Sequence, residues 1–134
     1  GFRRREAARA QLALACLAAL DLGARADEMA QDLPYGEQKL LAIAMALAAR
    51  PRLLLLDEIA GGLTDDEATA LTDTINDLRR DGVSIVWIEH VVRALLRVVD
   101  RLAVINFGRL LQEGLPDEVM ASRAVREVYM GIEA

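Results

Sequence analysis

The sequence is poor in the residues that form cross-links and in those that carry most enzyme chemistry. Its 134 residues include one cysteine, one histidine and three prolines, and only 4% are aromatic. The single Cys16 excludes an intrachain disulfide, and its place in an Ala/Leu run is typical of a core residue in a reducing compartment. No apolar run reaches the ~20 residues that span a membrane. The formal net charge of -5 argues against nucleic acid as a partner, because such binding needs a basic face.

Apolar residues are abundant enough to build a packed core. Hydrophobic residues make up 54% of the chain and charged residues 28%, which is typical of a globular protein. The length fits one domain or part of one. The first residue is Gly1 rather than Met, and no leader pattern follows it, so we expect the chain to begin within a longer protein.

Helical patterns fill the first fifty residues. Residues 3–20 are rich in Ala, Leu and Arg without Gly or Pro before Gly23, which predicts a helix. The polar residues 24–32 predict a second, short helix. A third helix is predicted after the break at 33–37, ending at Arg50-Pro51. Its apolar positions have helical spacing and are Leu40, Ile43, Ala44 and Leu47.

The middle of the chain has the pattern of a parallel βαβ unit. Residues 53–56 are four leucines, which predict a strand buried on both faces. Thr64 and Glu67 fit a capping box that opens a helix ending at Asp81-Gly82. Residues 83–88 are β-branched and aromatic, so they predict a second strand parallel to the first. The apolar stripe of the helix is Ala68, Leu71, Ile75 and Leu78.

The last forty residues predict a smaller set of elements. A short helix is expected over 91–97 and a strand over 102–107. Gly108-Arg109 predicts a hairpin turn into a strand at 110–112. From Pro116 the pattern is helical to the end of the chain.

Ionisable residues follow both strands of the βαβ unit. Asp57 and Glu58 follow the first strand, and Glu89 and His90 follow the second. Ligands collect at the carboxyl ends of parallel strands, and a carboxylate pair there suits chemistry on a metal-bound phosphate. Each pair also has a plain interpretation, because a strand leaving a core often ends in acidic residues and a lone histidine is often structural.

The order of the motifs resembles the C-terminal half of an ABC transporter ATPase domain. The motifs are Leu33-Pro34-Tyr35-Gly36-Glu37-Gln38, Arg50-Pro51, Leu-Leu-Leu-Leu-Asp57-Glu58, Gly61-Gly62-Leu63-Thr64 and Ile88-Glu89-His90. The Tyr-Gly signature, the Glu-His pair and the ending Arg-Glu-Val-Tyr-Met-Gly at 126–131 resemble the ATPase subunits of branched-chain amino acid importers.

The resemblance implies a role for each matched residue. Asp57 would hold Mg²⁺ through water, and Glu58 would act as the general base or orient the attacking water. His90 matches the switch histidine that touches the γ-phosphate. The signature faces the γ-phosphate of ATP on the opposite subunit, and the D-loop couples the two sites of a dimer. The signature residues are Leu33, Pro34, Tyr35, Gly36 and Glu37, and the D-loop residues are Gly61, Gly62, Leu63 and Thr64.

Several positions depart from the family pattern. Pro34 stands where Ser is commonest, and it supplies neither a hydroxyl nor an N–H. Tyr35 and Glu37 replace a Gly and a Gln, and Ile59 replaces the Pro that usually follows the catalytic Glu. Thr64 replaces Asp or Asn, and it can serve as a helix cap.

The expected fold is α/β, as the C-terminal part of a P-loop NTPase-type ATPase domain with parallel strands, crossover helices and a helical signature subdomain. The P-loop strand and helix are absent, because Lys39 is the only lysine and follows Gln38 rather than a glycine. The expected domains are a helical signature portion over 1–50, an α/β core over 51–114 and a helical tail over 115–134.

The resemblance also implies ATP and Mg²⁺ as cofactors, a second ATPase subunit in a head-to-tail dimer, and membrane permease subunits as partners. The location it implies is cytoplasmic, peripheral on the inner face of the cell membrane. The chain alone is expected to be inactive. It is also expected to have an exposed apolar surface and strand edge, and to self-associate, swap elements or be marginally stable. Two alternatives stay open: a non-catalytic short form that offers its signature to a complete subunit, and a plain α/β domain with coincidental motifs.

Overall fold

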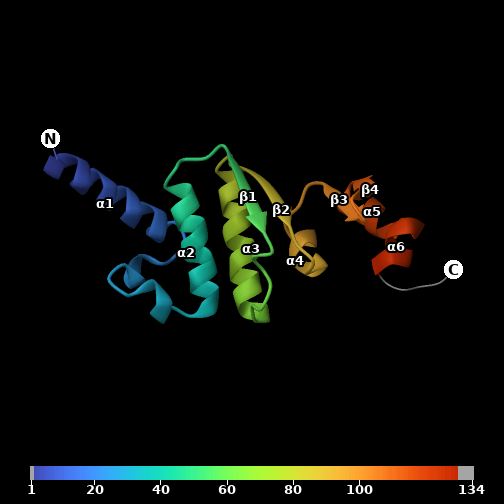
Figure 1. Ribbon diagram of the computed structural model, residues 1–134, viewed down its shortest axis with the longest axis horizontal. Helices are drawn as coiled ribbons and strands as arrows, with labels where there is room; N and C mark the ends of the chain where they lie inside the picture. Colours follow the sequence, from blue (N-terminus) through green and yellow to red (C-terminus); the bar gives the residue numbers. More distant parts are fainter. Residues whose placement is uncertain (1, 130–134) are drawn as a thin grey trace. The chain divides into compact units, whose positions relative to one another are not determined.

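The computed structural model describes residues 2–129, which form two compact units divided after Ala94 (Figure 1). The first unit contains the first three α-helices and a parallel strand pair. The second contains an antiparallel strand pair and two short helices. Within the described part of the chain, no helix is both long enough and apolar enough to cross a membrane.

Helices and short 3-10 turns fill the beginning of the first unit. They are α1 (Phe2–Ala18), η1 (Gly23–Arg25), η2 (Ala30–Asp32) and α2 (Tyr35–Leu47). The helix predicted over 24–32 is wrong, because two separate 3-10 turns stand there. Met29 between them has an extended backbone, with ψ at 133°. The polar segment has no apolar stripe whose burial would hold a longer helix together.

The predicted helical face of α2 is confirmed where it packs. Ile43 and Ala44 are buried, with 2% and 3% of their surface exposed. Other apolar residues of the preceding segments join this core, namely Leu20, Leu22 and Leu33. Helix α2 contacts both α1 and α3. The signature segment therefore opens a helix that is anchored in the core on one side.

The βαβ unit is confirmed, with β1 (Leu53–Asp57), α3 (Asp65–Arg80) and β2 (Ser84–Ile88). The two strands pair in parallel, from Leu53 opposite Ser84 to Asp57 opposite Ile88. The predicted capping box is present: the Thr64 side chain accepts a hydrogen bond from the Glu67 N–H, and the Glu67 side chain accepts one from the Thr64 N–H. The predicted end of α3 is also confirmed, with Gly82 at a φ of +90°.

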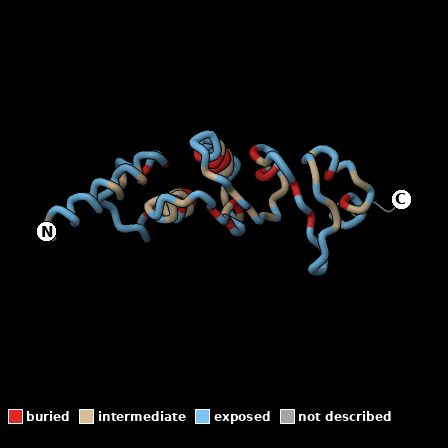
Figure 2. Tube along the Cα trace, turned by 90° about the horizontal axis from the view of Figure 1, so that it is seen from above, coloured by how far each residue is buried: buried red, intermediate tan, exposed pale blue. Residues whose placement is uncertain are grey.

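One face of the β1–β2 sheet is exposed. The burial of β1 on both faces that its four leucines predict is therefore wrong, whereas the exposed apolar surface expected of the isolated chain is confirmed. Leu54 and Leu56 are buried, but the alternate positions are not. We call these exposed positions the open face; they are Leu53, Leu55, Val86 and Ile88. Burial on both faces needs a layer on each side of the sheet, whereas the strand alternates between one covered side and one exposed side. In Figure 2, buried residues form only short segments along the chain, separated by exposed or intermediate ones.

The second unit is built on a β-hairpin. It contains β3 (Leu102–Asn106) and β4 (Arg109–Gly114), which pair antiparallel, and α5 (Pro116–Ala121) contacts both strands. A hairpin is present as predicted, but its two-residue turn lies one position earlier than Gly108-Arg109. Phe107 and Gly108 form the turn, both with positive φ, and Arg109 already pairs with Asn106 in β4. Helix α4 (Val92–Leu96) precedes the hairpin along the chain.

Among the described residues, the segment from Pro116 is helical as predicted, but it forms two helices with a break between them. The backbone of Ser122 is extended, with ψ at 139°, and it separates α5 from α6 (Arg123–Tyr129). The Ser122 side-chain oxygen accepts a hydrogen bond from the Val125 N–H at 3.4 Å, so this residue begins a new helix. The Met-Gly pair at 130–131 lies outside the described residues.

The open face predicts that the isolated chain self-associates. Leu55 has 70% of its surface exposed at the centre of this face, and contact with a second copy would remove the face from water. We expect sedimentation to show oligomers and the L55K variant to shift them toward monomer. The control variant M45K changes a residue of equal exposure (71%) on α2 and should leave the distribution unchanged. A monomer at all concentrations would contradict this prediction.

The capping box predicts a measurable contribution to stability. The T64A variant removes the acceptor for the N–H of Glu67 and should lower the free energy of unfolding by about 0.5–2 kcal/mol. The control T74A makes the same replacement inside α3, where alanine is the better helix former. Denaturant titration measures both, and equal effects of the two variants would contradict the assignment.

The same box predicts a pH dependence of stability. The pKa of Glu67 is lowered from 4.5, first by the backbone N–H of Thr64, then by the Thr64 hydroxyl and the Gly36 N–H, although burial opposes them. A carboxyl with a lowered pKa stabilises the fold above its unfolded pKa and loses that contribution as the pH falls through its folded pKa. The stability difference between wild type and E67Q should therefore be largest near neutral pH and shrink below about pH 4.5. A difference that does not depend on pH would contradict this account.

Candidate functional site

The parallel pairing brings the two predicted pairs of ionisable residues to one edge of the sheet. Asp57 is opposite Ile88 in the strand register, and the N–H of Glu58 donates to the carbonyl of Ile88 at 2.9 Å. The chain leaves β2 at Glu89 and His90, directly beside this contact. The sheet therefore places Asp57, Glu58 and His90 together.

Glu58 and His90 are both accessible from solvent. Nδ1 of His90 lies 3.9 Å from Oε1 of Glu58, and the two side chains are 67% and 65% exposed. Asp57 is also exposed. Among residues 2–129, no group of three or more His, Cys, Asp or Glu side chains could hold a metal ion. The exposed carboxylate of Asp57 is an oxygen ligand of the kind that Mg²⁺ binds, usually together with water and phosphate.

The backbone at Glu58 is held in an unusual conformation. Its φ is +47°, in the left-handed region that non-glycine residues seldom adopt. Such a conformation costs about 1–3 kcal/mol and persists only where neighbouring contacts hold it. The sequence did not indicate this strain, since a glutamate carries no local signal for a positive φ. The turn re-aims the chain directly after β1, at the residue expected to activate water.

Glu89 is a further residue of this site to which the sequence gave no role. Its side chain has no exposed surface, and its Oε1 lies 3.2 Å from Nδ1 of His90. His90 thus lies near two carboxylates, one exposed and one buried. The sequence carried no local signal for this burial, because Ala60, whose N–H donates to the carboxylate, lies 29 residues earlier in the chain.

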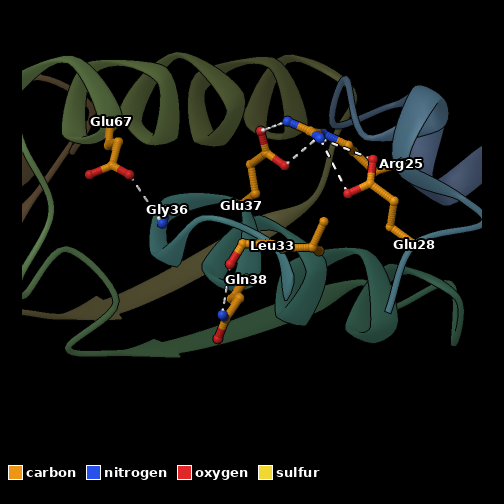
Figure 3. Close-up of polar contacts among 7 residues, drawn as sticks. All are labelled: Arg25, Glu28, Leu33, Gly36, Glu37, Gln38 and Glu67. Atoms are coloured by element: carbon orange, nitrogen blue, oxygen red, sulfur yellow. Dashed lines mark hydrogen bonds and ion pairs between the residues drawn. The ribbon is translucent and has the colours of Figure 1, made fainter. Parts of the chain in front are cut away.

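The signature segment forms a second group of polar contacts at the start of α2 (Figure 3). The N–H of Gly36 donates to Oε1 of Glu67 at 3.2 Å, and Nε2 of Gln38 donates to the carbonyl of Leu33 at 2.9 Å. Pro34 stands at the N-cap and makes no side-chain cap hydrogen bond. A carboxylate at a helix start is favourable because the N–H groups there carry a partial positive charge. Glu67 therefore serves two helix starts, those of α2 and α3.

Glu37 of the signature is directed to an arginine of the preceding turn. Nε of Arg25 lies 3.2 Å from Oε2 of Glu37, and Nη1 of Arg25 lies 3.0 Å from Oε1 of Glu28 (Figure 3). The pKa of Arg25 is raised by these carboxylates, chiefly Glu28. The carboxylate of Glu37 thus ties α2 to η1. Tyr35 instead is half exposed, with the ammonium of Lys39 4.9 Å from its ring centre.

The D-loop connects these two groups. A Cβ at Gly61 would lie 3.7 Å from the Glu58 carbonyl oxygen and 3.8 Å from Cε1 of His90. A Cβ at Gly62 would lie 3.2 Å from Cε1 of Tyr35, and Gly62 has a φ of +77°. A side chain at Gly62 would therefore be both strained and crowded. Neighbouring glycines of one loop thus lie close to the signature segment and to the strand-end group, by which we mean Asp57, Glu58 and His90.

Comparisons with known proteins agree with this arrangement. Residues 3–61 match the family model described as ABC transporter. The chain is 35% identical over 131 residues to the high-affinity branched-chain amino acid transport ATP-binding protein BraF of Pseudomonas aeruginosa, covering 97% of this chain and 51% of BraF. It is also 35% identical over 105 residues to the lipopolysaccharide export system ATP-binding protein LptB of Haemophilus influenzae, covering 78% of this chain and 44% of LptB.

The fold has solved counterparts. A crystal structure of an ATP-binding cassette of an ABC transporter in its ADP conformation superposes with a TM-score of 0.84 at 28% identity, covering 91% of this chain and 50% of that chain. A nucleotide-free cassette gives a TM-score of 0.84 at 26% identity. The chain thus spans about half the length of the relatives that it matches. By sequence and by fold, the chain is similar to part of the ATP-binding domains of ABC transporters.

Proposed function

We propose that the chain is the carboxyl-terminal half of the ATP-hydrolysing subunit of an ABC importer, where it supplies the groups that activate water. The observation that carries this proposal is the meeting of Glu58 and His90 at the carboxyl end of a parallel strand pair, with 3.9 Å between Nδ1 and Oε1. Ligands of parallel α/β sheets bind at that edge. The alternative of coincidental motifs does not account for two strand ends that converge in this way.

Each residue of the strand-end group has a distinct role in this proposal. Asp57 holds Mg²⁺ through water, and the ion, when bound, neutralises charge that develops on the phosphate. Glu58 orients or deprotonates the attacking water, for which its exposed carboxylate is accessible. His90 contacts the γ-phosphate. The phosphate-binding loop comes from the other half of the domain, so the chain alone is proposed to be inactive.

The signature is proposed to act on ATP bound by a second subunit in a head-to-tail dimer. The start of α2 supports this role, because backbone N–H groups at a helix start attract anions. In the described chain, the Gly36 N–H already donates to Glu67. The D-loop lies near both Tyr35 and His90. It is then suited to transmit a displacement of the signature segment to the residues that act on ATP in the same subunit.

Branched-chain amino acids are the cargo that we propose for the parent importer. The match to BraF spans 131 residues of the chain, whereas the match to LptB spans 105, at the same identity. The permease subunits would hold the ATPase on the inner face of the cell membrane. Leucine uptake by cells whose importer carries a complete subunit with this chain tests the proposal, and normal uptake after loss of the subunit would contradict it.

The E58Q variant of the complete subunit should lose hydrolysis. The amide keeps the shape of Glu58 but takes up no proton, so we expect turnover to fall by about 10²–10³-fold, the usual cost of losing one polar group aimed at the transition state. The variant should still bind ATP and accumulate as the ATP-bound dimer. The control E6Q makes the same change at an exposed position of α1. Normal turnover by E58Q would favour coincidental motifs.

The isolated 134-residue chain should hydrolyse no ATP. Asp57 and Glu58 have no phosphate-binding loop to work against, because the chain's one lysine contacts Tyr35 at the start of α2. Phosphate release with Mg²⁺ present measures this activity. Turnover that is abolished by E58Q in the same preparation would contradict the proposal, because a contaminating ATPase would not respond to that substitution.

A further inference from the structure

A buried carboxylate joins the two loops that carry the candidate catalytic groups. The Glu89 side chain is fully buried, and its Oε2 accepts a hydrogen bond from the N–H of Ala60 at 2.9 Å. Its Oε1 accepts hydrogen bonds from the N–H groups of His90 and Val91 at 3.0 and 3.3 Å. Burial of a carboxylate is costly unless such donors are provided. Three backbone donors from two loops therefore converge on one side chain.

The contact with Ala60 lies next to the strained turn at Glu58. On one side, the N–H of Glu58 donates to the carbonyl of Ile88, and on the other, the N–H of Ala60 donates to Glu89. Both acceptors belong to the end of β2 or to the residue that follows it. A glutamate keeps a left-handed backbone conformation only where the surrounding contacts hold it. These two hydrogen bonds bracket the residue and hold the turn to the neighbouring strand.

The same carboxylate faces the imidazole of His90. Nδ1 of His90 lies 3.2 Å from Oε1 of Glu89, against 3.9 Å from Oε1 of Glu58. In a neutral histidine, one ring nitrogen carries the proton and the other accepts, and the partner of the first decides which is which. The nearer carboxylate favours the proton on Nδ1. Nε2 of His90 then carries no proton and can accept a hydrogen bond from another group.

We propose that Glu89 is a positioning residue, which holds the backbone turn of Glu58 and sets the tautomer of His90. It acts through these two residues rather than on a substrate. The consequence for hydrolysis rests on the function proposed above, whereas the two structural effects do not. The sequence contains one histidine, so the side-chain signals of His90 can be observed without ambiguity.

Nitrogen NMR of the ¹⁵N-histidine-labelled chain tests the proposal at about pH 8.5, above the usual histidine range. We expect the Nδ1–H form in the wild type and a shift toward the Nε2–H form in E89M, which keeps the bulk and removes both acceptors. Amide exchange at Ala60 should become at least about tenfold faster in E89M, because a hydrogen bond that closes the turn is lost. The control E6M places methionine at an exposed position of α1 and should change neither signal.

A second variant keeps the test decisive if E89M does not fold, which circular dichroism reveals. E89Q keeps the shape of the side chain but offers one acceptor oxygen to two loops, so exchange must rise at Ala60 or at His90 and Val91. An Nε2–H form in the wild type, or unchanged exchange at all three amides in folded E89Q, would overturn the proposal.

Turnover of the complete subunit separates this inference from the proposed function. Displacing catalytic groups by about 1 Å can cost about 10²-fold in rate, so E89Q should lower kcat by about tenfold or more with little change in KM for ATP. If E58Q abolishes turnover and E89Q does not lower it, the positioning role fails and the proposed function stands. If neither variant lowers turnover, the proposed function fails, and the NMR result still decides the two structural effects.

Discussion

The parallel pairing of β1 with β2 is the constraint on which the candidate site depends. It brings the chain out of both strands at one edge, where the carbonyl of Ile88 receives the N–H of Glu58. No contact within either loop alone could bring Glu58 and His90 together. The pairing is itself supported by the buried leucines of β1 and by the capped crossover helix. The packing on the covered face of the sheet thus fixes the positions of Glu58 and His90 at its edge.

Two glutamates outside the expected site then connect its parts. Glu89 is buried between the strand-end loops, and Glu67 accepts hydrogen bonds at the starts of both α2 and α3. Each carboxylate satisfies backbone donors that a helix start or a loop leaves without partners. The D-loop lies between them, with Gly61 near His90 and Gly62 near Tyr35. Residues of the signature segment and of the candidate site therefore lie close to the same loop.

Much of this fold was predictable from local patterns. The capping box of Thr64 and Glu67, the parallel strands and the turn at Gly108 each follow from a short motif with a direct physical cause. The positive φ of Glu58 and the buried contacts of Glu89 were not predictable, because they depend on groups about thirty residues apart in the sequence. The exposure of Leu55 also depends on tertiary structure, since four leucines in a row do not say how many layers cover them.

Calorimetry of ATP and Mg²⁺ with the 134-residue chain tests the central claim most directly. If the chain is the half of an ATPase domain that activates water and recognises a partner's nucleotide, it should bind no ATP alone. A rise in the ATP affinity of a complete ABC ATPase subunit when the chain is added would instead support the alternative of a short-form partner. Tight binding by the chain alone would contradict the account, since it would require a phosphate site other than the one assigned to Asp57 and Glu58.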